Sequence, residues 1–354
     1  MIQQIGIRIN QMNLDRYIRQ MRFQPLGEEG QVNLSNSRVL VCGCGALGSI
    51  LANTLARAGV GHIRIVDRDF LELNNLQRQV LYTEQDVADG LPKAIAAKRH
   101  LEKINSSIQI EAVVADVSAS NILELVDGID CIVDGTDNFE TRFLLNDASI
   151  KTGIPWVYGG CIGAEGQTMT ILPDDTACLH CLMQAGPPPA GTTPTCDSAG
   201  ILSMIINVIA SIQACETIKI LSGNLDAISR KLQVFDIWEN RIRQIDLSAL
   251  RDGSSCPACR QREFSWLNGD RGSQAAVLCG RNAVQLSFPD HSGISLTDLE
   301  EKLQSVGQVS RNSFLLKLSV EDVALTVFPD GRAIVQGTED ESKARSIYAK
   351  YIGN

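Results

Sequence analysis

Short apolar runs alternate with segments of helical spacing along residues 38–151 of the chain. The runs are rich in Val and Ile and predict the strands Arg38–Gly43, His62–Asp67, Ile108–Asp116 and Cys131–Asp137. The segments between and after them predict the helices Ala46–Ala58, Lys93–Ile104, Ser120–Val126 and Phe139–Lys151. Strands that alternate with helices are typical of a parallel sheet covered by helices.

The alternation of strand and helix changes after residue 151. Ile154–Gly163 and Gln167–Leu172 predict neighbouring strands with too little chain between them for a crossover helix, so these strands are expected to be antiparallel. A long buried helix is predicted at about Gly200–Ser222, followed by a hairpin of Leu232–Ile237 and Arg241–Leu247. The predicted fold class is therefore α/β, a Rossmann-like and mostly parallel sheet with an antiparallel extension.

The chain divides into two predicted domains. Residues 1–262 form the large domain, and its stretch of about 182–199, rich in Pro, Gly, Thr and Ser, is predicted to be a crossover loop. A polar linker is expected at 263–274. Residues 275–354 then predict a small α+β domain, beginning with a strand at Ala276–Phe288 and ending with a helix at Ser342–Tyr351. No motif assigns this small domain a role.

Charge and hydropathy exclude some classes of function. The chain of 354 residues has a net charge of −9, so the basic footprint expected for binding nucleic acid or an anionic membrane is missing. The first residues do not read as a signal peptide, and polar residues interrupt the apolar stretch Ala199–Leu221. We therefore expect a cytoplasmic protein with no membrane and no nucleic-acid partner.

Three glycines follow the first predicted strand and open the first helix, at Gly43, Gly45 and Gly48. Small residues there let backbone N–H groups approach phosphate or ribose, and the helix dipole favours negative charge. Asp67 ends the second strand, where its carboxylate is placed to accept hydrogen bonds from ribose hydroxyls. The pattern predicts a nucleotide site, although many dinucleotide enzymes share it and a purely structural turn is the alternative.

Arg78, Lys93 and Asp137 lie just after strands or at a helix start, along the sheet edge where α/β proteins bind ligands. Taken singly, such residues are usually solvated side chains or helix caps. Attack at the α-phosphorus of a triphosphate needs cations for its oxygens and a carboxylate for Mg²⁺, and these three residues supply that set. A nicotinamide enzyme has no need of them.

Two pairs of cysteines have the spacing of metal ligands, Cys178 with Cys181 and Cys256 with Cys259. In a reducing compartment such pairs indicate metal rather than disulfides. Four thiolates predict a closed, structural zinc site, and the alternative is two unrelated reduced turns. His180 lies inside the first pair and is expected to be a bystander, since four thiolates complete the coordination shell.

Residues 14–260 resemble the ThiF/MoeB/HesA family, the bacterial relatives of ubiquitin-activating enzymes. The matching segments are RYIRQ (16–20), GCGALGS (43–49), VDRD (66–69), NLQRQ (75–79), GLPK (90–93), GTDN (135–138), both cysteine pairs and TCDSAGIL (195–202). The resemblance implies a homodimeric adenylyltransferase. Its substrates would be ATP and the C-terminal Gly-Gly carboxylate of a small β-grasp carrier, ThiS-, MoaD- or ubiquitin-like, and its products acyl-adenylate and pyrophosphate.

The resemblance also assigns residues to the nucleotide. Asp67 would bind ribose with Asp69 nearby, Asp137 would hold Mg²⁺, and Asn138 would lie beside it. The phosphates would be contacted by Asn75, Arg78 and Lys93. The glycine loop would comprise Gly43, Gly45, Ala46 and Gly48, where Ala46 replaces a glycine that is frequent in relatives and is small enough to change the loop little.

Two implied roles concern residues outside the sheet edge. Arg19, in the N-terminal RYIRQ helix, would reach into the nucleotide site of the neighbouring subunit. Cys196 occupies the position of a cysteine that forms a thioester or a persulfide-linked species in some members and is dispensable for adenylation in others. Both interpretations of Cys196 remain open.

Two other functions compete with adenylation. The first is a non-catalytic scaffold subunit of a heteromeric activating enzyme, which would be expected to lack ATP-contacting residues that this chain keeps. The second is a nicotinamide-dependent oxidoreductase, which the phosphate cations and the cysteine pairs disfavour. The sequence does not choose among carriers of the thiamine, molybdopterin, thiolated-tRNA or amino-acid sulfur pathways.

Overall fold

The computed structural model describes residues 14–184, 186–187, 199–253, 255–271, 275–278, 282–286, 293–320 and 322–352. The chain forms two compact units. The first comprises Met1–Pro194 and Ile201–Arg271, and the second Thr195–Gly200 and Gly272–Asn354. Each unit has its own sheet and its own hydrophobic core.

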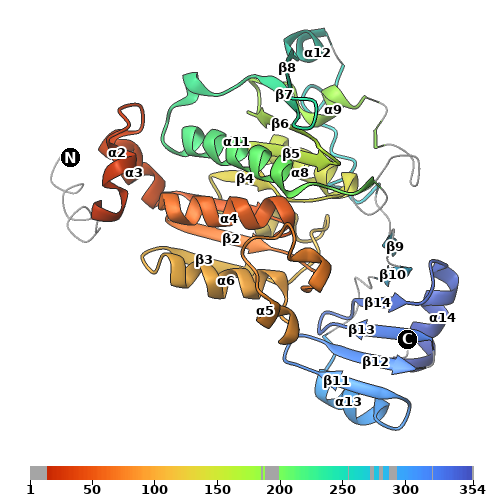
Figure 1. Cartoon of the computed structure of the whole chain (residues 1–354). Helices are drawn as coiled ribbons and strands as arrows, with labels where there is room; N and C mark the ends of the chain where they lie inside the picture. Colours follow the sequence, from red (N-terminus) through yellow and green to blue (C-terminus); the bar gives the residue numbers. More distant parts are fainter. Residues whose placement is uncertain are drawn as a thin grey trace. The chain divides into compact units, whose positions relative to one another are not determined.

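The first unit is built around an eight-stranded sheet in the order β3-β2-β1-β4-β5-β6-β7-β8 (Figure 1). Its strands are β1 (Arg38–Cys42), β2 (His62–Val66), β3 (Gln109–Val113), β4 (Cys131–Asp134), β5 (Trp156–Ile162), β6 (Glu165–Ile171), β7 (Lys231–Asp236) and β8 (Arg241–Asp246). Neighbours from β3 to β5 pair in parallel, and those from β5 to β8 pair antiparallel. This sheet confirms the predicted α/β fold class, including its antiparallel extension.

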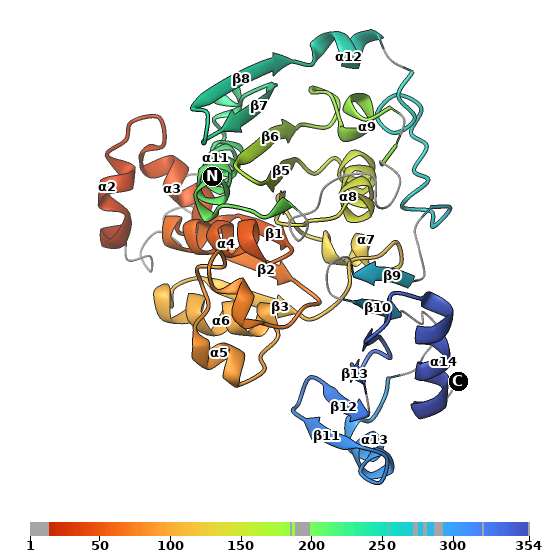
Figure 2. The ribbon, with the colours of Figure 1, turned by 45° about the vertical axis from the view of Figure 1, so that its right-hand side comes forward.

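Helices cover both faces of this sheet (Figure 2). They are α2 (Ile18–Met21), α3 (Gly27–Asn36), α4 (Ala46–Ala58), α5 (Glu84–Ala88), α6 (Lys93–Ile104), α7 (Ile122–Leu125), α8 (Phe139–Thr152), α9 (Leu179–Leu182), α11 (Ser203–Leu221) and α12 (Ser248–Gly253). Three short 3₁₀ helices are η1 (Leu14–Tyr17), η2 (Leu73–Asn75) and η3 (Leu225–Ala227).

The alternation of side chains along β1 explains why both faces need a cover. Val39 and Val41 enter one core cluster, which α4, α6 and α11 complete, whereas Leu40 and Cys42 enter a second cluster with α7 and α8. All four side chains are buried, because a parallel strand has an apolar environment on both sides. The site is thus carried by a rigid sheet that is packed on both faces.

Helix α11 is long and apolar enough, by length and composition alone, to cross a membrane. It was predicted as a buried helix, and it packs against α4, β5 and β6 of the first unit, with half of its apolar stretch buried. A core helix of a folded domain has the same properties.

The first unit extends further along the chain than the sequence predicts. Trp266 and Leu267 lie within the predicted linker 263–274, yet both are buried in the core of this unit. Their backbone N–H groups face Asp147 on α8, and the Trp266 ring stacks on Phe143 with 5.4 Å between centroids. The linker therefore cannot begin before these residues.

The described residues of the second unit form a six-stranded antiparallel sheet in the order β11-β12-β13-β14-β10-β9, together with the helices α13 and α14. Its elements are β9 (Ala275–Leu278), β10 (Ala283–Leu286), α13 (Leu296–Leu303), β11 (Gln308–Arg311), β12 (Leu316–Val320), β13 (Val323–Val327), β14 (Ala333–Gln336) and α14 (Glu341–Tyr351). The predicted α+β class is confirmed.

One strand of this unit was predicted wrongly. The segment Ala276–Phe288 was expected to be continuous, but β9 and β10 are two strands paired antiparallel. Asn282, just before β10, has a φ of 46°, in the left-handed region that Asn tolerates better than most residues. The turn at Asn282 divides the apolar run into two strands.

Candidate active site at the carboxyl edge of the sheet

Close backbone contacts shape the loop after β1. Gly43 has a φ of 80°, and a Cβ atom there would lie 2.8 Å from the carbonyl oxygen of Gly135. A Cβ atom on Gly48 would lie 1.9 Å from the carbonyl oxygen of Gly43. Gly45 is the N-cap of α4, and Gly45 and Ala46 are half-buried. The loop thus presents the N-terminus of α4 at the carboxyl end of β1, next to the segment that follows β4.

Asp67 ties this loop to β2. Its Oδ2 accepts a hydrogen bond from the Cys44 N–H at 2.6 Å, and its Oδ1 accepts one from the Asp69 N–H at 2.7 Å. Burial raises the pKa of Asp67, and the positive charge of Lys93 and the two N–H donors act against that rise. Both oxygens are therefore engaged by backbone in this structure, and the ribose contact of Asp67 remains a prediction.

Asp69 and Lys93 form an ion pair at the same edge. Lys93 Nζ lies 2.9 Å from Asp69 Oδ2, and only 5% of the lysine side chain is exposed. Arg68, between the two aspartates, places Nη1 3.0 Å from each carboxylate oxygen of Asp116, which follows β3. The structure thus brings Lys93 together with the end of β2, as the sequence predicts, and adds the Arg68–Asp116 pair, which the sequence reasoning missed.

The segment that carries Asn75 and Arg78 is a turn after β2. Asn75 is buried, and its Oδ1 accepts a hydrogen bond from the Glu72 N–H at 3.2 Å. Arg78 is half-buried and donates from Nη1 to the Asn74 carbonyl oxygen at 2.9 Å. Asn75 shapes the turn, and the phosphate contacts of both residues remain predictions.

Gln79 is the last residue of the NLQRQ segment, and the sequence alone assigns it no role. Its side chain is buried, and its Oε1 has no hydrogen-bond partner among the described residues. Its Nε2 lies 3.8 Å from the position of a Cβ atom on Gly45. A buried amide beside the glycine loop is a candidate contact for a bound nucleotide, and its only sequence signal was its place in that motif.

Asp137 follows β4 on the other side of the glycine loop. Its side chain is exposed, whereas the neighbouring Asn138 caps α8 by accepting a hydrogen bond from the Thr141 N–H at 2.8 Å. Burial alone would lower the pKa of Arg68, but the carboxylates of Asp116, Asp69 and Asp137 outweigh it and raise that pKa. Asp137 lies two residues after Gly135, whose carbonyl oxygen closely approaches Gly43 of the glycine loop, and its hard oxygen donors suit Mg²⁺.

Arg19 lies elsewhere in the unit. It is exposed on α2, which packs at the C-terminal end of α4: Gln20 Nε2 donates to the Ala58 carbonyl oxygen at 3.0 Å. The glycine loop is at the other end of α4, a helix of 13 residues and so about 20 Å long. Within one subunit the structure does not bring Arg19 together with the other predicted site residues.

The four paired cysteines converge within the first unit, although the two pairs are far apart in sequence. The sulfur atoms of Cys178 and Cys181 are 3.9 Å apart, those of Cys178 and Cys256 3.6 Å, and those of Cys181 and Cys259 3.5 Å. Four Zn–S bonds of about 2.3 Å in a tetrahedron place the sulfurs about 3.8 Å apart. The cluster thus has the dimensions of a tetrahedral metal site.

The His180 ring contacts a carboxylate: its Nε2 lies 3.3 Å from Oδ1 of the buried Asp147. That contact agrees with the prediction of a bystander. Cys196, the loop cysteine, lies outside the described residues, as does most of the predicted crossover loop 182–199.

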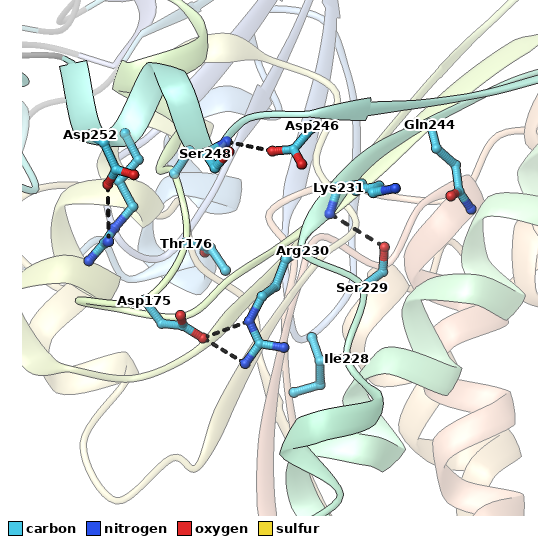
Figure 3. A pocket seen from close by; sticks show the side chains of 12 residues that line it. Asp175, Thr176, Ile228, Ser229, Arg230, Lys231, Gln244, Asp246, Ser248 and Asp252 are labelled. Carbon is cyan, nitrogen blue, oxygen red and sulfur yellow. Dashed lines mark hydrogen bonds and ion pairs between the residues drawn. The ribbon is translucent and has the colours of Figure 1, made fainter.

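A separate hollow of about 520 Å³ lies at the far end of the sheet, where β7, β8, α12 and residues 175–177 meet (Figure 3). Its lining balances Arg230, Lys231 and Arg251 against Asp175, Asp246 and Asp252. These include two ion pairs: Arg230 Nη2 is 2.9 Å from Asp175, and Arg251 Nη1 is 3.6 Å from Asp252. It therefore lacks the excess of positive charge that a triphosphate would need.

Comparison with known proteins assigns the chain to a family. The model of the ThiF family matches residues 17–258. The sulfur carrier protein ThiS adenylyltransferase of Bacillus subtilis (strain 168) is 43% identical over 339 residues, which are 96% of this chain and 99% of that protein. The sulfur carrier protein adenylyltransferase of Thermus thermophilus is 37% identical over 251 residues, 70% of this chain and 90% of that protein.

A solved structure extends the comparison to the fold. The crystal structure of E. coli MccB with ATP has a TM-score of 0.55 and 25% identity, covering 66% of this chain and 72% of that one. Adenylyltransferase relatives favour adenylation over the scaffold and oxidoreductase hypotheses. The chain belongs to the ThiF family and is an adenylyltransferase.

Proposed function

We propose that this chain uses ATP to adenylate the C-terminal carboxylate of a small ThiS-like sulfur carrier protein that ends in Gly-Gly. The relative named for ThiS aligns with 96% of the chain, including the second unit, whereas the relative from Thermus aligns with 70%. The higher identity and longer match of the relative named for ThiS favour ThiS over other carriers. The observation that carries the reaction is the meeting of three segments at one sheet edge: the glycine loop, the segment of the Asp69–Lys93 pair, and the segment that carries Asp137.

In the proposed reaction the carrier carboxylate attacks the α-phosphorus of ATP and pyrophosphate leaves. The attacking group is already ionised, so no general base is needed, and the enzyme acts by alignment and charge stabilisation. Lys93, Arg78 and Asn75 would contact the phosphates, and the two cations would offset charge on the phosphate oxygens. Asp67 would bind the ribose. Nucleotide binding would compete with Asp69 for Lys93.

Asp137 would hold Mg²⁺, a role that its exposed carboxylate and hard oxygen donors support. When bound, the ion would offset charge on the triphosphate. The four sulfurs would hold Zn²⁺ as a closed structural site, which their tetrahedral spacing supports. Free thiols in such a cluster fit a reducing compartment, and the cytoplasm is the proposed location.

A homodimer would bring Arg19 to the nucleotide of the neighbouring subunit. The outward side of α11 supports an oligomer, because apolar side chains lie there beside the polar Asn207 and Ser211: Met204 is 60% exposed, and Val208 and Ile212 are partly exposed. Exposed apolar side chains that lie together are typical of a surface that a partner covers. Cys196 would either form a thioester or persulfide-linked species or have no essential part.

Exchange of radiolabel between pyrophosphate and ATP tests this function. The purified chain should catalyse exchange only when a ThiS-like carrier is present, and mass spectrometry should detect the carrier acyl-adenylate. A carrier lacking its last glycine serves as the matched control, and MoaD-like carriers test the choice of partner. No exchange with any Gly-Gly carrier would rule the proposal out, whereas exchange with a MoaD-like carrier alone would overturn only the choice of ThiS.

A further inference from the structure

A fully enclosed ion pair lies beside the loop that carries Asp137. Asp134 is the last residue of β4 and has no exposed surface, and Arg142 lies in the first turn of α8 with 7% of its surface exposed. Arg142 Nε is 3.4 Å from Asp134 Oδ2. A buried ion pair is costly to desolvate unless further hydrogen bonds compensate both charges. The reaction proposed above uses neither residue.

The hydrogen bonds of this pair converge on Thr136, the residue before Asp137. Asp134 Oδ1 accepts hydrogen bonds from the Thr136 N–H at 2.8 Å and from its hydroxyl at 2.7 Å. Arg142 Nη2 donates to the Thr136 carbonyl oxygen at 2.7 Å. The peptide groups on both sides of Thr136 are therefore held, one by each member of the pair.

Arg142 is itself locked in place. Nη2 also donates to the Gly159 carbonyl oxygen on β5 at 3.1 Å, and the guanidinium lies over the rings of Phe139 and Tyr158, 5.5 and 5.4 Å from their centroids. The Arg142 N–H donates to the Asn138 carbonyl oxygen at 3.4 Å. Backbone on both sides of Asp137 is thus anchored to the sheet and to α8, while the Asp137 carboxylate stays exposed.

The geometry points to Asp134 and Arg142 as positioning residues that hold Asp137 where it binds the divalent cation of the ATP complex, an inference that rests on the proposed function. A side chain that supports a metal ligand fixes its orientation and so sets the affinity for the metal. Burial alone would lower the pKa of Arg142, but Tyr158, Asp134 and Asp137 together raise it. Asp137 is thus within electrostatic reach of the guanidinium as well.

Binding of Mn²⁺ to the chain in the presence of ATP, followed by the enhancement of water-proton relaxation that protein-bound Mn²⁺ produces, tests this role without any turnover. Arg142→Lys keeps the charge and should weaken Mn²⁺ binding several-fold. The double change Asp134→Asn with Arg142→Gln removes both charges without leaving one unpaired, and should weaken binding about tenfold or more. ATP binding without metal should be unchanged in both variants.

A second arginine–carboxylate pair in the same unit offers a matched control. Arg64 Nε lies 2.9 Å from Glu111 Oε2, between β2 and β3. The double change Arg64→Gln with Glu111→Gln should lower the melting temperature and leave Mn²⁺ affinity as in the wild type. A merely structural role for Arg142 predicts the same result for the Arg142 variants.

The outcomes separate the two proposals. Wild-type Mn²⁺ affinity in folded Arg142→Lys and in the double variant would overturn the positioning role while leaving the adenylation site intact. If the double variant does not fold, Arg142→Lys decides by itself. A wild-type chain that binds neither ATP nor Mn²⁺–ATP would overturn the proposed function and this role with it.

Discussion

Lys93 Nζ lies 2.9 Å from Asp69 Oδ2, and the Lys93 N–H donates to the Asp69 carbonyl oxygen, also at 2.9 Å. The first residue of α6 is thus joined twice to the segment after β2. A buried ammonium group needs a partner, and Asp69 supplies one before nucleotide arrives. The ion pair holds the ammonium group of Lys93 at the sheet edge.

Replacing Lys93 should therefore impair catalysis much more than folding. We expect Lys93→Ala to lower the rate of ATP–pyrophosphate exchange about 10²–10³-fold, as is usual when a group that stabilises developing charge is removed. Lys98→Ala is the matched control, because Lys98 lies on the same helix and pairs with Glu102 at the surface. Comparable exchange rates for the two variants would show that Lys93 takes no part in the reaction.

The sequence predicts those features that depend on residues close together along the chain. Pro92 marked the start of α6 at Lys93, and the spacing of Cys178 and Cys181 indicated half of a metal site. The fold class followed from the alternation of strand and helix. Each of these signals can be recognised in one sequence because the residues that form it are near one another along the chain.

Features that depend on distant partners could not be predicted. Nothing near Trp266 indicates burial, because the ring against which it stacks, Phe143, lies far away on α8. In the sequence, Asp134 is a residue at the end of a strand and Arg142 a residue on a helix. Their pairing depends on the packing of β4, α8 and β5. Asp67 was expected to face ribose, and only the folded loop shows that two backbone N–H groups already engage it.

Removing the metal from the cysteine cluster should destabilise the first unit. The cluster joins the turn of Cys178 and Cys181 to that of Cys256 and Cys259, and a structural metal contributes directly to the free energy of folding. We expect Cys259→Ser to lose bound zinc and to lower the melting temperature by at least about 5 °C. Cys215→Ser, which removes an exposed thiol, should change neither quantity.

Metal analysis and thermal melting of the two serine variants check this prediction. Full zinc content in Cys259→Ser, or a melting temperature equal to that of Cys215→Ser, would contradict a four-thiolate site. Chelation of the wild type should reproduce the lower melting temperature of Cys259→Ser.

The stability of the first unit should fall in mild acid because of His62. Burial lowers the pKa of His62, and the nearby Glu111, 3.1 Å from Nε2, acts against that shift. The folded chain therefore binds a proton at His62 less readily than the unfolded chain, whose histidine has a pKa of about 6.5. This contribution to stability is complete above the unfolded value and is lost as the pH falls through it.

Urea unfolding at a series of pH values measures this effect. The free energy of unfolding of the wild type should fall more between about pH 7.5 and pH 5.5 than that of His62→Gln, since only the wild type carries at this position an imidazole that binds a proton more readily in the unfolded chain than in the folded chain. Parallel curves for the two proteins would show that His62 does not set the acid sensitivity.

Arg19 is expected to act across the subunit interface, since α2 packs at the end of α4 that is remote from the glycine loop. Arg19→Ala and Asp137→Ala should each abolish exchange when assayed alone. Mixed and allowed to exchange subunits, they form heterodimers in which one site combines an intact Asp137 with the partner's intact Arg19. Equal mixing of a symmetric dimer makes half of the dimers mixed, so about a quarter of the wild-type activity should return.

The same mixture separates action within one subunit from action between subunits. If Arg19 served the site of its own chain, each half of the heterodimer would carry one defect, and no activity would return. Arg22→Ala, which alters a nearby arginine at the end of α2, should be active alone and should leave the activity of an Asp137→Ala mixture at the level set by dilution. Because adding two inactive proteins together would restore turnover, the experiment also establishes the dimer on which the role of Arg19 depends.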